Sequence, residues 1–457
     1  MTGFEEYLVP GKKGHLIGIG GVSMSPLAEV LAGVGLIIRG SDMNDSEKVE
    51  HIRSLGISVN IGHNGNNLDA DTDFVVRTAA VHDDNPEIAA AHARNIPVFE
   101  RTQAWGAIMR DYKNAVCISG THGKTTTTSM STHILMAAQR DPTVMIGGTL
   151  PLLQAGHRVG KGDTIVMESC EYYDSFLSFY PTVAVILNIE ADHLDFFKDL
   201  ADIQKSFRKF ASLVPETGYI VANADDKNTM DAIAGLERNI LTFGLNAEAD
   251  VCADNIECKG AQTEFDVIYK GEIFTHVSLR VPGLHNVKNA LAATAATICL
   301  GIDPTAVTYG LSGFTGAGRR FEFKGKYNGA DVYDDYAHHP GELKALLDAV
   351  ETLNYKRIIL VFQPHTYSRT YALFNDFAEQ LRRPTLCLLA EIYAAREQNT
   401  LGISSSDLAK EIPNSKYFAT FTELEACLHE TALPGDIILT VGAGDVYKLG
   451  EQLVAAE

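Results

Sequence analysis

The chain has 457 residues, a length that predicts two to four domains, with three as the central expectation. Hydrophobic residues make up 46% and charged residues 21%, which excludes a disordered protein and leaves enough apolar side chain for several cores. Acidic residues outnumber basic ones by 58 to 38, and the net charge of -20 argues against nucleic acid and membrane surfaces as partners.

The sequence shows no run near the roughly 20 continuous apolar residues that a membrane span needs. Residues 1–10 also lack the basic start and apolar core of a signal peptide, so we expect a cytoplasmic protein. The seven cysteines are scattered and form no CxxC pair, which predicts reduced thiols rather than disulfides or a zinc site.

The first 112 residues alternate short apolar runs with helical patterns, which is typical of parallel strands joined by crossover helices. A polar break at 112–114 predicts the first domain boundary. The expected strands are 15–19, 36–39 and 74–77, and the expected helices are 23–34 and 85–94.

The alternation continues through a second region, 113–316, and a third region, 317–457, so the predicted class is α/β with three domains. The glycine-rich stretch 309–319 is typical of a hinge between domains. The expected strands are 115–119, 164–167, 183–188, 218–222, 357–362, 385–389 and 437–441, and the expected helices include 341–352 and 372–382.

The strongest local signal, Ile-Ser-Gly-Thr-His-Gly-Lys-Thr-Thr at 118–126, follows an apolar strand and precedes a helix expected to run to about Ala138. Glycine N–H groups at a helix start bind phosphate, a lysine meets the terminal phosphates, and the next hydroxyl binds Mg²⁺. The segment therefore predicts a shortened phosphate loop, with an ordinary glycine-rich turn as the alternative. Its candidate residues are Gly120, Thr121, His122, Gly123, Lys124, Thr125 and Thr126.

A second glycine-rich turn near the amino end resembles a dinucleotide-binding fingerprint, with serine in place of its third glycine. Asp42 follows about 20 residues later, where a carboxylate accepts hydrogen bonds from a ribose. The turn is compatible with NAD, with another nucleotide diphosphate, or with a packed turn that binds no ligand. Its glycines are Gly18, Gly20 and Gly21.

Acidic groups follow two expected strands of the second region, at 168–171 and 188–193. Carboxyl ends of parallel strands gather at one sheet edge, and oxygen ligands suit Mg²⁺, so Glu171 and His193 are candidate metal ligands. The adjacent His338 and His339 find no third ligand at suitable spacing, so we predict no transition metal there.

Together these segments resemble the Mur ligase family, ATP-dependent enzymes that build the peptide of peptidoglycan precursors. The resemblance covers nearly the whole chain, and its pieces occur in the family's order. They are GIGGVSMSPLAEVL, GTHGKTTT, ESCEYYDSFL, NIEADHLD, GLHNVKNA, GRRF, DDYAHHPGE, QPHTYSRT and GAGD.

The resemblance implies a Rossmann-like UDP-sugar-binding domain at 1–112, a P-loop-type ATP-binding domain at 113–316 and a Rossmann-like amino-acid-binding domain at 317–457. It implies ATP and Mg²⁺ as cofactors, and amide formation between UDP-N-acetylmuramate and L-alanine through an acyl phosphate. Domain closure is expected to keep water from that intermediate. We expect a monomer or a homodimer.

The resemblance also assigns roles to single residues. It places Gly18, Gly20, Gly21, Ser41 and Asp42 on the UDP-sugar; His285, Asn289, Arg320 and Asp335 on ATP beside the phosphate loop; His338, His365 and Arg369 on the amino acid; Thr125, Glu171 and His193 on the metal; and Lys124, His193 and Arg320 in catalysis.

Three departures from the family's pattern bear on these roles: the residues around Glu171, Thr366 in place of a common arginine, and Arg396 in place of a common glycine. Arg208 occupies the place of a lysine that some relatives carbamylate, so no carbamylated lysine is expected. The rival functions are an NAD-dependent dehydrogenase, a regulatory NTPase and the family's ligase that adds a tripeptide to the same nucleotide.

Overall fold

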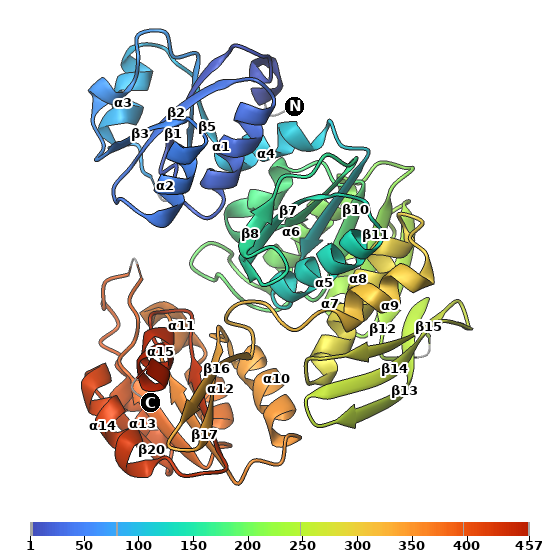
Figure 1. Cartoon of the computed structure of the whole chain (residues 1–457), viewed down its shortest axis with the longest axis vertical. Helices are drawn as coiled ribbons and strands as arrows, with labels where there is room; N and C mark the ends of the chain where they lie inside the picture. The colour runs from blue at the N-terminus through green and yellow to red at the C-terminus, as the bar shows by residue number, and fades with distance from the viewer. Residues whose placement is uncertain (1–2, 79–80, 247, 396, 456–457) are drawn as a thin grey trace.

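The computed structural model describes residues 3–78, 81–246, 248–395 and 397–455, so Arg396 lies outside the described residues. The chain forms three sheets in succession, and each sheet with its helices makes one structural unit (Figure 1). The amino-terminal and carboxy-terminal units flank the central unit. In the described residues, each helix is too short or too polar to cross a bilayer.

The amino-terminal unit is built on a five-stranded parallel sheet in the order β3-β2-β1-β4-β5. This order reverses direction between β1 and β4, which is the Rossmann-like arrangement predicted from the sequence. Its elements are η1 (Phe4–Tyr7), β1 (Lys13–Ile17), α1 (Met24–Gly33), β2 (Ile37–Asp42), α2 (Glu47–Ser54), β3 (Ser58–Ile61), η2 (Gly65–Asn67), β4 (Phe74–Arg77), α3 (Pro86–Ala93), β5 (Val98–Glu100) and α4 (Arg101–Met109).

The central unit carries a ten-stranded sheet in the order β15-β14-β13-β12-β11-β10-β6-β9-β7-β8. Its middle strands are parallel, as expected, but the β7–β8 hairpin and the β13–β15 meander are antiparallel additions that the sequence analysis did not predict. Its elements are β6 (Asn114–Ser119), α5 (Lys124–Ala137), β7 (Thr143–Leu150), β8 (Ala155–Arg158), β9 (Thr164–Glu168), η3 (Tyr172–Ser178), β10 (Val183–Ile186), α6 (Leu200–Ser212), β11 (Tyr219–Asn223), α7 (Lys227–Ile233), β12 (Asn239–Gly244), β13 (Val251–Lys259), β14 (Gln262–Tyr269), β15 (Glu272–Leu279), α8 (Leu284–Ile298) and α9 (Pro304–Ser312).

The carboxy-terminal unit has a six-stranded sheet in the order β16-β17-β21-β18-β19-β20, parallel except for the β16–β17 hairpin. Its buried apolar residues form separate clusters on the two faces, because helices cover both faces. Its elements are β16 (Glu322–Tyr327), β17 (Ala330–Asp335), α10 (Pro340–Glu351), β18 (Arg357–Phe362), α11 (Tyr367–Ala372), α12 (Phe374–Leu381), β19 (Leu386–Ala390), α13 (Ser405–Glu411), β20 (Ser415–Phe418), α14 (Phe421–Thr431), β21 (Asp436–Val441) and α15 (Tyr447–Ala455).

One expectation was partly wrong and another was confirmed. Residues 309–312 belong to α9 and not to a hinge, and Gly310 permits close helix packing, since a Cβ there would lie 2.5 Å from Ile134 Cα. The helix expected at 372–382 is confirmed as α12, Phe374–Leu381, and a separate short helix, α11, precedes it with Leu373 between the two.

The two junctions between units differ in chemistry. The apolar core of the amino-terminal unit is continuous with that of the central unit through α4, whose Trp105 is fully buried in the same cluster as Phe176 and Phe210. The carboxy-terminal unit meets the central unit through ion pairs instead, such as Arg369–Asp192 and His122–Glu342. Because polar contacts exchange readily with water and ligands, the second junction is suited to a binding site.

Candidate active site

The phosphate loop lies between β6 and α5, as the sequence predicts. Gly120 and Gly123 have φ of 138° and 85°, and a Cβ on Gly123 would lie 2.5 Å from Asn289 Oδ1, so a side chain is excluded there. Asn188, just after the end of β10, holds the loop through two hydrogen bonds. The backbone N–H of Thr121 donates to the Asn188 carbonyl at 3.1 Å, and that of His122 donates to Asn188 Oδ1 at 2.8 Å.

Lys124, the first residue of α5, has a side chain that is 14% exposed and turned back over the loop. Its Nζ donates to the carbonyl oxygens of Gly120 and Thr121 and lies 3.2 Å from Glu171 Oε2. Burial by itself would lower the pKa of Lys124, but the negative charge of Glu171 outweighs it and raises that pKa above its ordinary value. Lys124 is therefore a permanent cation at the start of the helix.

Thr125 faces a second carboxylate. Its Oγ1 donates to Glu168 Oε2 at 2.9 Å, and the Gly147 backbone N–H donates to the same oxygen at 2.7 Å. Arg320 Nη2 lies 3.4 Å from Thr125 Oγ1, which brings a residue of the carboxy-terminal segment to the phosphate loop. Glu168 was part of an acidic cluster in the sequence, but the structure places it, rather than Glu171, beside Thr125.

His193, the third predicted metal ligand, lies next to this group without joining it. Its ring stacks on that of Tyr172, with centroids 4.3 Å apart, and Tyr172 directly follows Glu171 in the sequence. Its backbone is in the left-handed region, with φ of 51°, and its N–H donates to Asp192 Oδ1 at 2.8 Å. The metal role predicted for His193 stays a prediction.

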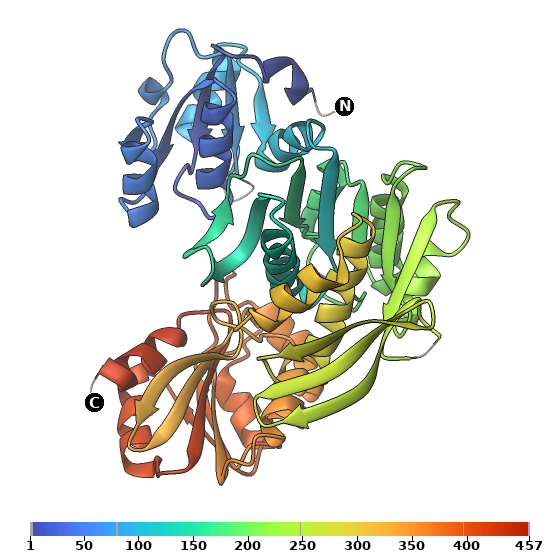
Figure 2. The same cartoon turned by 45° about the vertical axis from the view of Figure 1, so that its right-hand side comes forward.

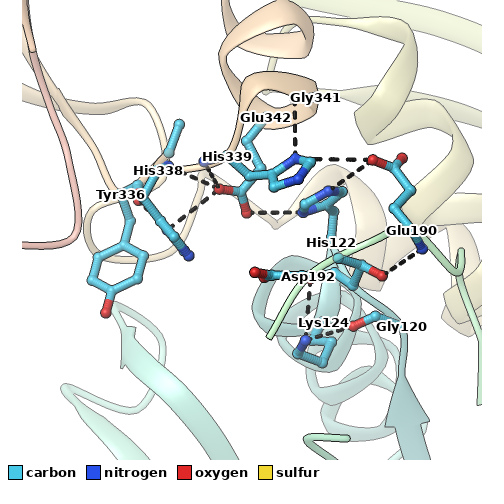
Figure 3. A network of polar contacts seen from close by, with 12 residues as sticks. Gly120, His122, Lys124, Glu190, Asp192, Tyr336, His338, His339, Gly341 and Glu342 are labelled. Atoms are coloured by element: carbon cyan, nitrogen blue, oxygen red, sulfur yellow. Dashed lines mark hydrogen bonds and ion pairs between the residues drawn. The ribbon is translucent and has the colours of Figure 1, made fainter. Parts of the chain in front are cut away.

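His122 bridges the central and carboxy-terminal units (Figure 3). Its Nε2 lies 3.3 Å from Glu190 and its Nδ1 lies 3.3 Å from Glu342 of α10, while its ring packs on His339 at 4.7 Å. Burial alone would lower the pKa of His122, but hydrogen bonds to Glu190 and Glu342 raise it to about 10. The imidazole is therefore protonated at neutral pH and holds α10 against the loop.

The carboxylate of Glu342 also organises the start of α10. It accepts the backbone N–H of His338 at 2.9 Å and that of His339 at 3.2 Å, within a capping box formed with His339. His122, Glu190 and His339 also bring three potential metal-ligating atoms within 4.8 Å of one another. The spacing argument against a third ligand missed this group, because Glu190 and His122 come from a different unit.

A cavity of about 260 Å³ opens beside the loop at this junction. Burial raises the pKa of Asp335 to about 6, although its carboxylate accepts the backbone N–H groups of Phe321 at 2.7 Å and Ala337 at 2.8 Å. Burial also lowers the pKa of His285 to about 4, so this imidazole is neutral at neutral pH. The residues predicted for ATP that line the cavity are His122, Gly123, Thr125, Thr126, His285, Asn289, Arg320 and Asp335.

The three residues predicted for the amino acid form a second group near Asp192. Arg369 donates from Nε and Nη2 to Asp192 Oδ1 at 3.2 and 3.0 Å, and its Nη1 lies 3.2 Å from His365 Nδ1. His338 packs edge-on against His365. Burial lowers the pKa of both His338 and His365 to about 4, so Arg369 carries the positive charge of these three at neutral pH.

The glycine-rich turn of the amino-terminal unit is already hydrogen-bonded within the protein. The backbone N–H groups of Gly18 and Ile19 donate to the Ser41 carbonyl, and Gly20 N–H donates to Asp42 Oδ2 at 2.9 Å. Ser41 Oγ donates to the buried Glu87 at 2.6 Å. Asp42 therefore shapes the turn in this structure, and its predicted contact with a ribose stays a prediction.

Beyond this turn, a cavity of about 230 Å³ separates the amino-terminal and central units. Val22 and Ser23 line one side of it, with Arg101 of α4, and Gly147 and Glu168 line the other. Glu168 thus accepts a hydrogen bond from Thr125 of the phosphate loop and also lines this cavity.

Models of one family match all three parts of the chain. They are described as "Mur ligase family, catalytic domain" at residues 13–113, "Mur ligase middle domain" at 118–297 and "Mur ligase, glutamate ligase domain" at 319–444. The chain belongs to the Mur ligase family.

Within that family, the chain is similar to UDP-N-acetylmuramate–L-alanine ligases. It is 47% identical to that of Clostridium novyi, covering 98% of both chains, and 46% identical to that of Agathobacter rectalis, covering 96% of this chain and 97% of the relative. The crystal structure of UDP-N-acetylmuramate-alanine ligase from Thermotoga maritima matches with a TM-score of 0.79 and 29% identity, covering 97% of this chain and 98% of that one.

Proposed function

We propose that the protein is an ATP-dependent ligase that joins L-alanine to UDP-N-acetylmuramate through an acyl phosphate, in the synthesis of peptidoglycan precursors. The observation that carries the proposal is the phosphate loop, which opens into a cavity at the polar junction between two units. Full-length similarity to ligases of that name supports it. An NAD-dependent dehydrogenase would leave the loop at Gly120–Thr126 without a role.

In this proposal each of the three units binds a different substrate. Residues 1–112 hold the UDP-sugar, 113–316 hold ATP and 317–457 hold the amino acid. The cavity lined by Ser23, Arg101 and Glu168 lies between the first two units, so it is the path along which the sugar's carboxylate reaches the phosphate loop. From the third unit, Arg369 contacts Asp192 in the segment after β10, and Asn188 of that segment binds the phosphate loop.

ATP phosphates are expected at the start of α5. The N–H groups in the first turn of a helix have no partner within the helix, and the positive end of its dipole favours anions. Lys124 now contacts loop carbonyls and Glu171, so it exchanges those contacts for phosphate oxygens when ATP binds. Arg320, beside Thr125, adds a second cation for the charge that develops during phosphoryl transfer.

The donor groups beside the loop fit Mg²⁺. Thr125 Oγ1 and Glu168 Oε2 lie 2.9 Å apart, which is about the separation of adjacent oxygen ligands around an octahedral ion with bonds of about 2.0–2.1 Å. We propose that Thr125 holds the ion with Glu168 or Glu171, and that His193, in the loop at 188–193, is a further ligand as predicted. The bound ion neutralises phosphate charge.

Arg369 is the proposed anchor for the alanine carboxylate. A small amino acid offers little apolar surface, so strong recognition requires a cation with paired donors. Arg369 presents such donors, and at present two of them bind Asp192. His338 and His365, both neutral, complete the polar surroundings.

The experiment that tests the function measures phosphate release from ATP in the presence of UDP-N-acetylmuramate. The second acceptor is either L-alanine or the tripeptide that another ligase of the family, the recycling ligase, adds to the same nucleotide. The proposal expects release that requires both the UDP-sugar and L-alanine. Release with tripeptide but not L-alanine would instead identify a recycling ligase, and release without either acceptor would favour the regulatory NTPase. Magnesium dependence, cytoplasmic location and the choice between monomer and homodimer stay predictions.

A further inference from the structure

A second group of metal-ligating side chains lies away from the ATP cavity, where the amino-terminal unit meets the central unit. Glu29 comes from α1, His51 from α2 and His157 from β8. One ligating atom from each lies within 4.8 Å of the others. In Figures 1 and 2 the β7–β8 hairpin of the central unit faces the helices of the amino-terminal unit.

The distances in this group suit a tetrahedral ion. Glu29 Oε2 lies 3.3 Å from His157 Nε2 and 3.6 Å from His51 Nε2. Bonds of about 2.0–2.1 Å at tetrahedral angles separate two ligands by about 3.3–3.4 Å. The carboxylate oxygen of Glu29 therefore stands at ligand spacing from His157 and slightly beyond it from His51, and the three ligating atoms all lie within 4.8 Å of one another.

The chemistry of the donors selects the kind of ion. Two imidazoles with one carboxylate are typical of Zn²⁺ and related transition metals, whereas Mg²⁺ and Ca²⁺ prefer oxygen ligands alone. Glu29 and His157 are about one-third and one-fifth exposed, which leaves an entry path and room for a water as fourth ligand.

We propose that Glu29, His51 and His157 form a Zn²⁺ site that fastens the amino-terminal unit to the β7–β8 hairpin. His157 pairs with Met145 across that hairpin, and Met145 lines the cavity that also contains Val22 and Ser23. A bound ion thus fixes the distance between the two walls of this cavity. The site does not depend on the proposed reaction, since its three ligands lie outside the groups assigned to ATP and the amino acid.

The test is a calorimetric titration of the metal-stripped, full-length protein with ZnCl₂. We expect one equivalent to bind, with an affinity that falls at least about tenfold in each of Glu29→Gln, His51→Ala and His157→Ala, since even indirect partners of metal ligands change affinity by 10- to 100-fold. His92→Ala, which removes an exposed histidine from α3, is the matched control and should keep the wild-type affinity.

His51 and His157 belong to different units, so a loss of zinc affinity in both variants would show that the ion binds between the units. If His51→Ala or His157→Ala binds zinc as tightly as the wild type, the three side chains do not form one site and the proposal is overturned. The same holds if the tight equivalent persists in all three variants but disappears in His339→Ala, because the ion then binds at His122, Glu190 and His339.

Melting temperatures measured with and without zinc distinguish the loss of a metal ligand from poor folding of a variant. Without zinc, the three variants should melt within a few degrees of the wild type, since their side chains are partly exposed. With zinc in excess, the wild type and His92→Ala should melt at a higher temperature, because the ion binds only the folded chain. An equal rise in Glu29→Gln would count against the site.

Discussion

Changing Arg369 to lysine should raise the Michaelis constant for L-alanine far more than those for ATP and UDP-N-acetylmuramate. Lysine keeps the positive charge but loses the planar fork, which now donates from two nitrogens to Asp192. The Arg369 and Asp192 side chains are only 11% and 10% exposed, so water screens this position weakly.

The expected size follows from the loss of one charge-assisted hydrogen bond to the alanine carboxylate. Such a bond contributes about 1.5–3 kcal/mol, and about 1.4 kcal/mol corresponds to a tenfold change, so the constant for alanine should rise about 10- to 100-fold. The assay is phosphate release with each substrate varied in turn while the other two are saturating. Constants for ATP and the UDP-sugar should change less than about threefold.

Two controls separate alanine binding from closure of the units. Arg383→Lys makes the same exchange at an arginine that pairs with Asp348 and Glu351 and lines neither of the two cavities, and it should leave all three constants unchanged. Asp192→Asn removes the negative charge that pairs with Arg369 but keeps the arginine, so alanine affinity should be retained. An equal rise of all three constants in Arg369→Lys would refute the reasoning and assign Arg369 to closure.

Three further predictions concern the phosphate loop, the amino-terminal turn and the junction between units. Lys124→Ala should reduce ATP-dependent phosphate release by about 100- to 1,000-fold with an unchanged circular dichroism spectrum, because it removes a cation aimed at transition-state charge; wild-type turnover would contradict the loop assignment. Asp42→Ala should weaken UDP-N-acetylmuramate binding and spare ATP binding in calorimetry, because the carboxylate shapes a turn on another unit; loss of ATP binding would contradict the division of substrates. The pKa of His122 is about 10 in the folded chain and about 6.5 in the unfolded chain, so its protonation stabilises the fold. This stabilisation should be complete below pH 6.5 and should be lost as the pH rises towards 10, where the folded imidazole loses its proton. Denaturant titrations of wild type and His122→Gln at pH 6, 8 and 10 check this, and a stability difference that does not shrink with pH would exclude a charged His122.

Local sequence pattern determined the parts of the fold that depend on neighbouring residues. The strands at 74–77 and 357–362 have the predicted bounds, because apolar β-forming residues bounded by polar ones favour a buried strand wherever the strand is placed. The strand and the helix on either side of the segment 118–126 were also predicted, and its binding of phosphate stays a prediction. The family resemblance then supplied the order of the three units.

Tertiary structure alone decided which side chains meet. Arg369 and Asp192 are 177 residues apart, and His157 and Glu29 are 128 apart, and no periodicity in the sequence relates such positions. Because local sequence pattern carries no information on such contacts, the sequence analysis did not find Glu342 as the partner of His122. For the same reason it did not find Glu168 as the partner of Thr125. The sequence determines the chemistry of each side chain. The distances between the units depend on how their cores and the polar junction pack, and that packing determines which side chains form the candidate site.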